Sequence, residues 1–351
     1  MEKFLNKLKQ KNIPWSKDVN LTELKKGYSR ISNILQSLNL IPELSPQQFF
    51  RLTKGHTQKY YSVCADKNQD KKYFFRSLVN LKLIQNSDFA REIQLMQIIK
   101  NSAVPFKKYL LNYIKFSTDI NLPWILLEYL DTTTVLEDKD RRGRLTRTLT
   151  DAEIQLLVNV INELQTVPLD IIQNKLSIPT FNIVNSLYNQ ISEKYYQNKS
   201  IHTLLDESSF KISLDIIKKN EQLISEESKY PTHGDFYSGN IFINTSNQNA
   251  QIRIVDWENF HINNFAYDIT FFYVHLFKED DFANRITAEY RKQLSLGLHN
   301  KFDRLFKLNL IYLCLKSLVM DTFYDYSKKE AVQKRNGLKK MLIRTINQMN
   351  L

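Results

Sequence analysis

The chain of 351 residues is poor in glycine and cysteine and has no long apolar segment. Its seven glycines supply no G-x-G-x-x-G loop for cradling phosphates. Its two cysteines, Cys64 and Cys314, match no zinc or redox spacing, which favours a reducing compartment. No apolar run approaches the roughly 20 residues that cross a bilayer, and the amphipathic start MEKFLNKLKQ is not a signal-peptide core. We therefore expect a cytoplasmic protein with no membrane span.

A concentrated basic patch is also missing, although the net charge is +12. Basic residues are spread thinly, and the one local cluster is KDRRGRLTR at residues 139–147. Such a cluster is more often a solvated loop than an anion contact. With no recognised nucleic-acid-binding motif, the charge disfavours a nucleic-acid partner. A hydrophobic content of 42% and a charged content of 25% are typical of a globular protein.

The hydrophobic pattern predicts two different regions. Up to about residue 130, short β-type runs alternate with few helices. The predicted helices there are 3–12, 21–38 and 87–101, and the predicted strands are 49–54, 59–65, 71–79, 107–117 and 123–130. From about residue 150, long helices dominate and only two strands remain. The predicted helices are 151–166, 180–197, 209–227, 283–298, 301–326 and 329–349, and the strands are 240–244 and 252–257.

The segment HGDFYSGN, residues 233–240, carries the strongest chemical signal. Asp235 and Asn240 lie five positions apart before an apolar strand, and Asp256 follows a second strand. Phosphoryl transfer needs an acid near the acceptor hydroxyl, oxygen ligands for magnesium and a cradle for the nucleotide. Magnesium prefers one or two carboxylates together with other oxygen ligands. The order H-x-D-x-x-x-x-N, strand, hairpin and second aspartate is that of kinase catalytic loops.

HGDFYSGN, IVDWENF and the following FAYDITFF resemble the aminoglycoside phosphotransferase and choline kinase superfamily. The resemblance extends over roughly residues 49–350, because PWILLEYL resembles the family's hinge and LLVNVINELQTVPLD its first large helix. It implies an α+β, bilobal protein-kinase-like fold. Residues 46–130 would form a nucleotide-binding lobe with a small antiparallel sheet, and residues 131–351 a mostly helical lobe for catalysis and acceptor binding. Residues 1–45 would be a helical extension.

The resemblance also implies roles for individual residues. Asp235 would accept or orient the proton of the acceptor hydroxyl, and Asn240 and Asp256 would bind magnesium. Arg76 would contact the phosphates of ATP or GTP, held there by Glu92 in the segment FAREIQLMQIIKNSAVPFKKYL. The remaining implied roles are contacts to the adenine edge by the backbone of Glu128 and Leu130, and bracing of the loop by Asp268.

The sequence departs from the family pattern at two places. The nucleotide lobe offers only Gly55 where a glycine-rich loop is common, and the first large helix ends in Leu164-Gln165 rather than Leu-His. Two further positions have competing interpretations. His233 is predicted to support the loop rather than to react. Glu258 fits a metal or acceptor contact and a surface residue equally well.

These features predict an ATP- and magnesium-dependent phosphotransferase acting on a hydroxyl of a small molecule, such as a sugar, an amino alcohol or an aminoglycoside-like compound. One alternative is a catalytically silent kinase-like binding or regulatory module, which the presence of all three motif residues disfavours. Another is a protein-kinase-like enzyme, which the missing A-P-E element disfavours. The oligomeric state is left open.

The acceptor is constrained least. An aminoglycoside would need carboxylates, and the net charge of −4 over residues 151–230 allows that. Choline would need an aromatic cage, for which the candidates are Trp257, Tyr267, Tyr324 and Tyr326. His275 stands where choline kinases carry an acid, which counts against choline. We therefore expect a neutral or weakly cationic polyhydroxylated acceptor.

Overall fold

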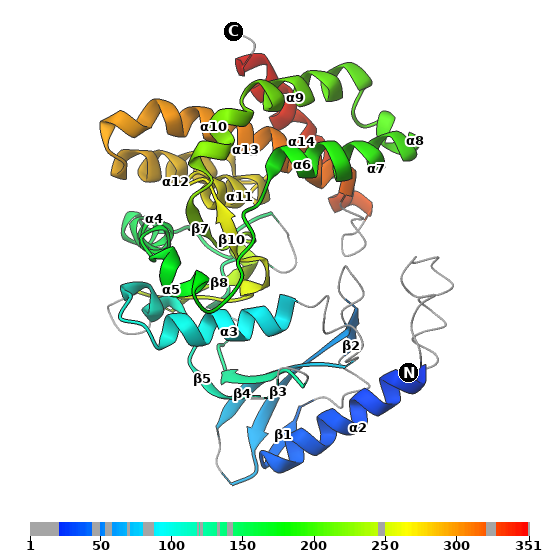
Figure 1. The fold of residues 1–351 in the computed structure, drawn as a ribbon, viewed down its shortest axis with the longest axis vertical. Coiled ribbons are helices and arrows are strands. Elements are labelled where there is room, and N and C mark those ends of the chain that lie inside the picture. The colour runs from blue at the N-terminus through cyan, green and yellow to red at the C-terminus, as the bar shows by residue number, and fades with distance from the viewer. Residues whose placement is uncertain are drawn as a thin grey trace. The chain divides into compact units, whose positions relative to one another are not determined.

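The computed structural model describes residues 21–43, 50–52, 58–68, 71–79, 88–117, 119, 122–131, 134–138, 143–244, 250–320 and 328–349. The chain forms two compact units (Figure 1). Unit 1 comprises Met1–Gln97 and Leu110–Asp131, and unit 2 comprises Ile98–Tyr109 and Thr132–Leu351. The predicted helix 3–12, Gly55, residues 139–142 of the basic cluster, Tyr324 and Tyr326 lie outside the described residues.

Unit 1 is built on a six-stranded antiparallel sheet of order β1-β3-β4-β6-β5, with β2 also paired to β3. Its strands are β1 Leu40–Pro42, β2 Phe50–Leu52, β3 Gln58–Asp66, β4 Lys72–Leu78, β5 Tyr113–Phe116 and β6 Trp124–Glu128. The ladders align Arg76 on β4 with Tyr61 on one side and Ile125 on the other. Arg76 therefore lies on a central strand, where its backbone is fixed from both sides.

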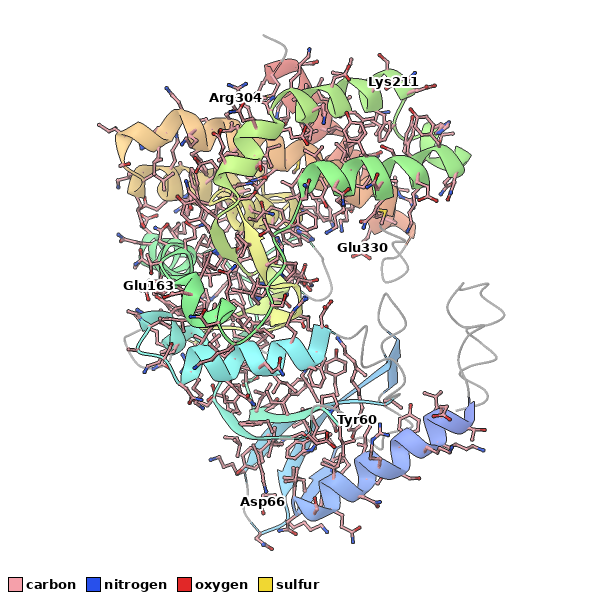
Figure 2. The ribbon with its side chains drawn as sticks, in the orientation of Figure 1. Tyr60, Asp66, Glu163, Lys211, Arg304 and Glu330 are labelled. Carbon is pink, nitrogen blue, oxygen red and sulfur yellow. The ribbon has the colours of Figure 1, made fainter. Side chains whose placement is uncertain are left out.

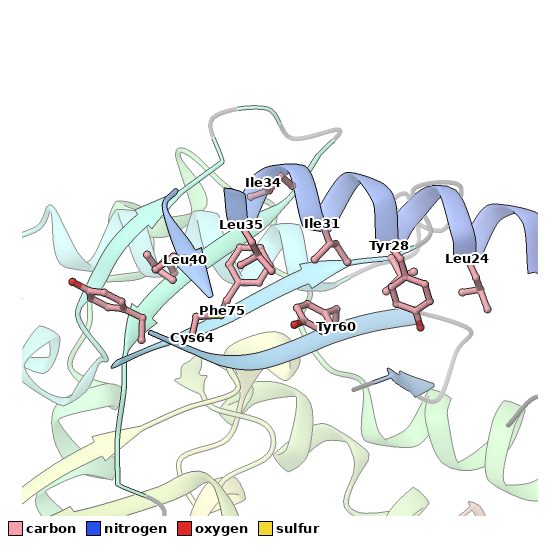
Figure 3. Close-up of a cluster of buried hydrophobic side chains, with 12 residues drawn as sticks. Leu24, Tyr28, Ile31, Ile34, Leu35, Leu40, Tyr60, Cys64 and Phe75 are labelled. Atoms are coloured by element: carbon pink, nitrogen blue, oxygen red, sulfur yellow. The ribbon is translucent and has the colours of Figure 1, made fainter. Parts of the chain in front are cut away.

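Helix α2, Leu21–Ser37, covers one face of this sheet (Figure 3). Its apolar stripe includes Leu24, Tyr28 and Ile31, all buried against the sheet. Gly27 permits a close approach, because a Cβ there would lie 2.0 Å from the carbonyl oxygen of Val79. Helix α2 and strand β1 come from the segment predicted to be an N-terminal extension, and both belong to the core of unit 1.

Helix α3, Asp88–Lys100, is amphipathic and carries Glu92 on its buried side. The chain passes from unit 1 to unit 2 within this helix, after Gln97. A 3-10 turn, η3 Pro105–Tyr109, follows it in unit 2.

Unit 2 is mostly helical. Its α-helices are α4 Asp151–Gln165, α5 Leu169–Gln173, α6 Ile183–Asn185, α7 Ser192–Gln197, α8 Lys199–His202, α9 Glu207–Lys219, α10 Glu221–Glu227, α11 Tyr267–His275, α12 Asp280–Gln293, α13 His299–Met320 and α14 Lys328–Met349. A π-helical turn, Ser186–Ile191, joins α6 to α7. Two antiparallel strand pairs complete it: β7 Tyr230–Thr232 with β10 His261–Asn263, and β8 Ile241–Asn244 with β9 Gln251–Ile254. Helix α13 is buried along most of its length.

Most predicted elements occur, but three predictions were wrong in part. Residues 107–117 are a strand only from Tyr113, because Phe106 and Tyr109 are buried as a 3-10 turn. The helix predicted at 209–227 is interrupted at Asn220, whose side chain caps the carbonyl of Ile216 at 2.7 Å. The strand predicted at 252–257 ends at Ile254, before the left-handed backbone of Asp256.

The other deviations are shifted ends and short unpredicted strands. Helix α12 begins at Asp280 and ends at Gln293, so residues 294–298 are not part of it. Strands β1, β7 and β10 are three residues each, which is too short for a hydrophobic pattern to reveal. Within the part of the chain that the structure describes, no helix is both long and apolar enough to span a bilayer.

Candidate active site

The loop that follows β7 is held at both ends in unit 2. Strand β7 pairs with β10, and the hydroxyl of Thr232 donates to the carbonyl of His261 at 2.7 Å. Gly234 follows with φ of +80°, a conformation that glycine adopts without strain. A Cβ at this position would lie 2.1 Å from the carbonyl oxygen of Asn259. The glycine of the motif is therefore required by the backbone path.

Asp268, on the first turn of α11, braces the loop. Its buried carboxylate accepts the backbone N–H of His233 at 2.8 Å and that of Gly234 at 3.1 Å. Burial raises the pKa of Asp268 to about 7, while the two N–H donors act in the opposite direction. The expected bracing role of Asp268 thus has a direct geometric basis.

His233 lies in the interior, and both of its ring nitrogens make hydrogen bonds to the backbone. Its Nδ1 accepts the backbone N–H of Asp235 at 3.2 Å, so Nε2 carries the proton and donates to the carbonyl of Val255 at 3.0 Å. The ring packs edge-on against Trp257, with 4.4 Å between centroids. Burial lowers the pKa of His233 to about 4, which keeps it neutral near pH 7. These contacts suit a supporting residue.

Asp235 and Asn240 are in direct contact. The Asn240 Nδ2 group donates to the backbone carbonyl of Asp235 at 2.9 Å and to its carboxylate Oδ2 at 3.0 Å. Asp235 is half-buried, and its pKa is raised to about 7, first by desolvation and then by the negative charge of Asp256. A carboxyl held this way, with a pKa near neutrality, suits proton transfer to or from a hydroxyl.

Asp256 is drawn to the same place through the backbone. The N–H of Val255 donates to the carbonyl of Asn240 at 3.0 Å, which ties the end of the β8–β9 hairpin to the loop. Asp256 itself has φ of 67° and ψ of 61°, a left-handed conformation that is uncommon outside glycine. Such conformations cluster at functional sites. The structure therefore brings together the three residues of the motif in unit 2.

Arg76 and Glu92 form a charged pair in unit 1. Nη1 of Arg76 lies 2.9 Å from Oε1 of Glu92, and both side chains are almost wholly buried, at 6% and 3% exposure. The guanidinium also lies over two aromatic rings, 5.2 Å from the Tyr61 centroid and 5.1 Å from that of Phe89. The predicted pairing of Arg76 with Glu92 is present, and its burial separates it from an ordinary surface ion pair.

Glu128 and Leu130 lie at and just after the end of β6 in unit 1. The N–H of Glu128 donates to the carbonyl of Asn112 at 2.9 Å, and its carboxylate accepts the N–H of Asn112 at 3.0 Å. These two bonds join Glu128, at the end of β6, to Asn112 through the side chain and the backbone N–H of Glu128. The expected contact of the Glu128 and Leu130 backbone with the adenine edge stays a prediction.

Several supporting residues were not predicted. Gln165 donates to the carbonyl of Phe265 at 2.7 Å, and the hydroxyl of Tyr290 donates to the same carbonyl at 2.8 Å. Asn264 and Asn309 exchange two amide hydrogen bonds, of 2.8 and 3.0 Å, in the interior. Both sets hold the segment that leads into Asp268. Gln165 was marked only by its departure from the Leu-His pattern, and the asparagine pair left no local signal because its members are 45 residues apart.

Two of the aromatic residues suggested for a choline cage, Trp257 and Tyr267, are buried in the interior. Trp257 and Tyr267 are each 1% exposed, and Trp257 donates its indole N–H to the carbonyl of Ile254 at 3.2 Å. Neither ring can enclose an ammonium group. His275 instead stacks on Phe271 and lies 5.1 Å from the ring of Tyr237, two residues after Asp235. Glu258 is half-buried, and its electrostatic effect raises the pKa of Asp235.

Comparison with known proteins agrees with this geometry. A model of the phosphotransferase enzyme family matches residues 78–305, well over half of the chain. The chain belongs to this phosphotransferase family. The resemblance to aminoglycoside phosphotransferases and choline kinases is thereby confirmed, as is the expected enzyme class, a phosphotransferase with an alcohol group as acceptor. No curated protein matches the sequence.

Three solved structures illustrate the fold. A microcompartment-associated aminopropanol kinase is 13% identical, with a TM-score of 0.56, and the match covers 92% of this chain and 99% of that one. A choline kinase from Streptococcus pneumoniae is 12% identical, with a TM-score of 0.54 and coverage of 90% and 98%. An amicoumacin kinase in complex with AMP-PNP, Ca2+ and Ami is 11% identical, with a TM-score of 0.54 and coverage of 93% and 96%. At these identities the likeness is one of fold, and it confirms the predicted α+β kinase-like class.

Proposed function

We propose that this phosphotransferase uses ATP, or GTP, and magnesium to phosphorylate a hydroxyl of a neutral or weakly cationic polyhydroxylated small molecule. The proposal rests on the contacts of one residue, Asn240. Its amide nitrogen holds Asp235 at 3.0 Å, while its backbone carbonyl holds the hairpin end that leads into Asp256. One residue thus links the proposed proton acceptor to the proposed metal ligands.

The donor set of unit 2 fits magnesium. Because the Asn240 amide nitrogen is engaged with Asp235, its amide oxygen is the atom that could face a cation. Asp256 adds a carboxylate, so the ligands are all oxygen, as magnesium prefers. Bound magnesium would neutralise charge on the transferring phosphoryl group. A nucleotide and a divalent cation are present in the complex of the amicoumacin kinase.

The chain's own residues then have distinct tasks. Asp235, with its pKa raised to about 7, would accept the proton of the acceptor hydroxyl as the bond to phosphorus forms. Asp268 and His233 would keep that carboxylate in place through the loop backbone. In unit 1, Arg76 would contact the nucleotide phosphates, with Glu92 fixing its orientation. The backbone of Glu128 and Leu130 would bind the adenine edge.

The acceptor class is supported by what surrounds Asp235. Lys316 acts on Asp235 with a positive charge, which disfavours a polycation at this carboxylate. The buried positions of Trp257 and Tyr267 remove two candidates for an aromatic cage. The half-buried Tyr237 and His275 offer a hydroxyl and an imidazole, which hydrogen-bond to neutral hydroxyl groups.

A coupled ADP-release assay tests the proposal. The purified full chain is given ATP or GTP with sugars, amino alcohols, aminoglycosides and nucleosides, with magnesium and with EDTA. We expect turnover on a hydroxylated small molecule that disappears in EDTA. Equal turnover in EDTA would contradict the metal requirement. Turnover on a peptide, with none on any small alcohol, would show that the acceptor class is wrong.

A further inference from the structure

Unit 2 contains a cavity that the proposed reaction does not use. It has a volume of about 550 Å³ and lies where the ends of α9 and α14 meet the first turns of α13. A volume of this size is typical of a small-molecule site. Three cationic side chains line the cavity, Lys219, Arg304 and Lys307, and Figure 2 labels Arg304 on α13.

Cationic side chains outnumber carboxylates in the lining of this cavity. Its one carboxylate, that of Asp303, is held by Arg291 through both oxygens, at 2.8 and 3.0 Å. Among the residues that the structure describes, Lys219, Arg304 and Lys307 have no carboxylate within ion-pair distance. Three like charges around one hollow repel each other, so an anion bound there would be stabilised.

The end of α9 is capped without these cations. The negative end of α9 lies at the cavity, and lysines often offset such an end. Here Asn220 already caps α9, because its backbone N–H donates to the carbonyls of Ile217 and Lys218 and its side chain to that of Ile216. Lys219 and Lys307 are therefore not needed as caps.

A hydrogen bond to Asn220 fixes the orientation of the Arg304 guanidinium. Its Nε donates at 2.7 Å to Oδ1 of Asn220, which is 7% exposed and is itself fixed by the bond to Ile216. This contact orients the planar guanidinium and leaves its Nη groups for the cavity. A fixed guanidinium recognises phosphate by two parallel hydrogen bonds.

We propose that this cavity, lined by Lys219, Arg304 and Lys307, binds a phosphate monoester of a polar small molecule. The cations would hold the phosphate, which carries a charge of about −1.5 to −2 at neutral pH. The amides of Asn300 and Gln348, which also line the cavity, would hydrogen-bond to hydroxyl groups of the ester. Binding here does not depend on catalysis by Asp235.

Calorimetry on the full chain in EDTA tests the site, with glycerol 3-phosphate and inorganic phosphate as separate ligands. We expect one saturable site for the ester, with a dissociation constant below about 10 mM. Lys219→Gln and Lys307→Gln together should weaken it by about tenfold or more, since charged hydrogen bonds are lost. Arg304→Lys keeps the charge but loses the fork, and should also weaken binding.

Lys218→Gln is the matched control. Lys218 neighbours Lys219 but pairs with Glu221 and does not line the cavity. Its substitution should leave affinity unchanged within about twofold, because only general charge is altered. The proposal fails if no saturable binding occurs, if the double variant binds normally, or if Lys218→Gln weakens binding as much as the double variant. Inorganic phosphate binding as tightly as the ester would overturn the assignment of an ester.

Discussion

The two charged clusters proposed to act together are stabilised in opposite ways. In unit 1, Arg76 and Glu92 neutralise each other between the rings of Tyr61 and Phe89. In unit 2, Asp268 is buried and Asp235 half-buried, and neither carboxylate has a cationic partner at ion-pair distance in the described part of the chain. Asp268 is held by backbone N–H groups and Asp235 by the Asn240 amide. The Arg76–Glu92 contact joins opposite charges, whereas Asp235 and Asp268 are held by uncharged donors.

That difference has a physical consequence for each cluster. A buried ion pair depends on both partners, because removing one leaves an uncompensated charge in a poorly solvated place. A carboxylate held by dipoles alone is costly when ionised, and this cost appears as the raised pKa values of Asp235 and Asp268. The unit 2 cluster is therefore suited to gain a cation and a proton, and the unit 1 cluster to orient a fixed positive charge.

The largest effect is expected when the proton acceptor of unit 2 is removed. Asp235→Asn should lower turnover by about three orders of magnitude or more, because the charge at the reacting centre is lost. Asn preserves shape and can still accept the hydrogen bond from Asn240, so nucleotide binding should be retained. Single-turnover kinetics and calorimetry measure the two quantities. Near-normal turnover in the folded variant would falsify the proposed role of Asp235.

The second prediction separates the two proposed metal ligands. Asp256→Ala should reduce magnesium-dependent nucleotide binding to the metal-free level, since a carboxylate contributes more to magnesium than an amide oxygen does. Asn240→Ala should weaken that binding by only about tenfold, or about 1.4 kcal/mol. It should also slow turnover, because Asp235 loses both bonds from the amide.

Calorimetry with and without magnesium distinguishes these outcomes. Equal affinity for the magnesium–nucleotide complex in wild type and Asp256→Ala would remove Asp256 from the metal site. Metal-free nucleotide binding is the internal control, because neither substitution replaces a residue proposed to contact the nucleotide. A loss of metal-free binding would indicate a folding defect instead.

The third prediction breaks the unit 1 pair. Arg76→Ala should raise the Michaelis constant for ATP and slow turnover, whereas Arg76→Lys should retain part of both as a point charge without the planar fork. Glu92→Ala leaves Arg76 buried without its carboxylate, and losses of this kind cost about 3–5 kcal/mol of stability. Urea denaturation and steady-state kinetics measure these effects. Wild-type behaviour of both Arg76 variants would mean that Arg76 does not contact the nucleotide.

The sequence predicted the elements that carry these residues better than the contacts that fix them. Asp235, Asn240 and Asp256 were found because their spacing is local and sits beside two apolar strands. The Arg76–Glu92 pair was found only through resemblance, since strand β4 and helix α3 give no pairing rule. Tyr61 and Phe89, which sandwich the guanidinium, left no signal. The Tyr61 contact depends on β-sheet register, which hydrophobic alternation alone does not specify across strands, and the Phe89 contact depends on how α3 packs on the sheet.

Other features could not be predicted for similar reasons. The left-handed backbone of Asp256 ended a strand that the apolar pattern continued. The Asn264–Asn309 pair joins residues far apart in the chain. An asparagine within an apolar helix does not indicate which residue it will hydrogen-bond to. The assignment of residues 1–45, 46–130 and 131–351 to an extension and two functional lobes stays a prediction, as do the site roles.

The last prediction concerns pH and isolates the energetic cost of ionising Asp235 in unit 2. The pKa of its carboxyl is about 7 in the folded protein, because of burial and the charge of Asp256, against about 3.9 in an unfolded chain. Between these values the folded state keeps a proton that the unfolded state releases. The contribution of Asp235 to stability is therefore complete below about pH 4 and is lost as the pH rises through about 7.

Asp235→Asn has no such proton, so the stability of wild type relative to this variant should fall as the pH rises. In EDTA we expect wild type to be less stable than the variant at pH 8, and this disadvantage to be much smaller at pH 5. Urea denaturation at both pH values measures the difference. The same substitution at Asp215, exposed on α9, is the control for the chemical change itself. If the stability difference between wild type and Asp235→Asn does not change with pH, the surroundings do not raise the pKa of the Asp235 carboxyl, and the contrast between the two clusters is lost.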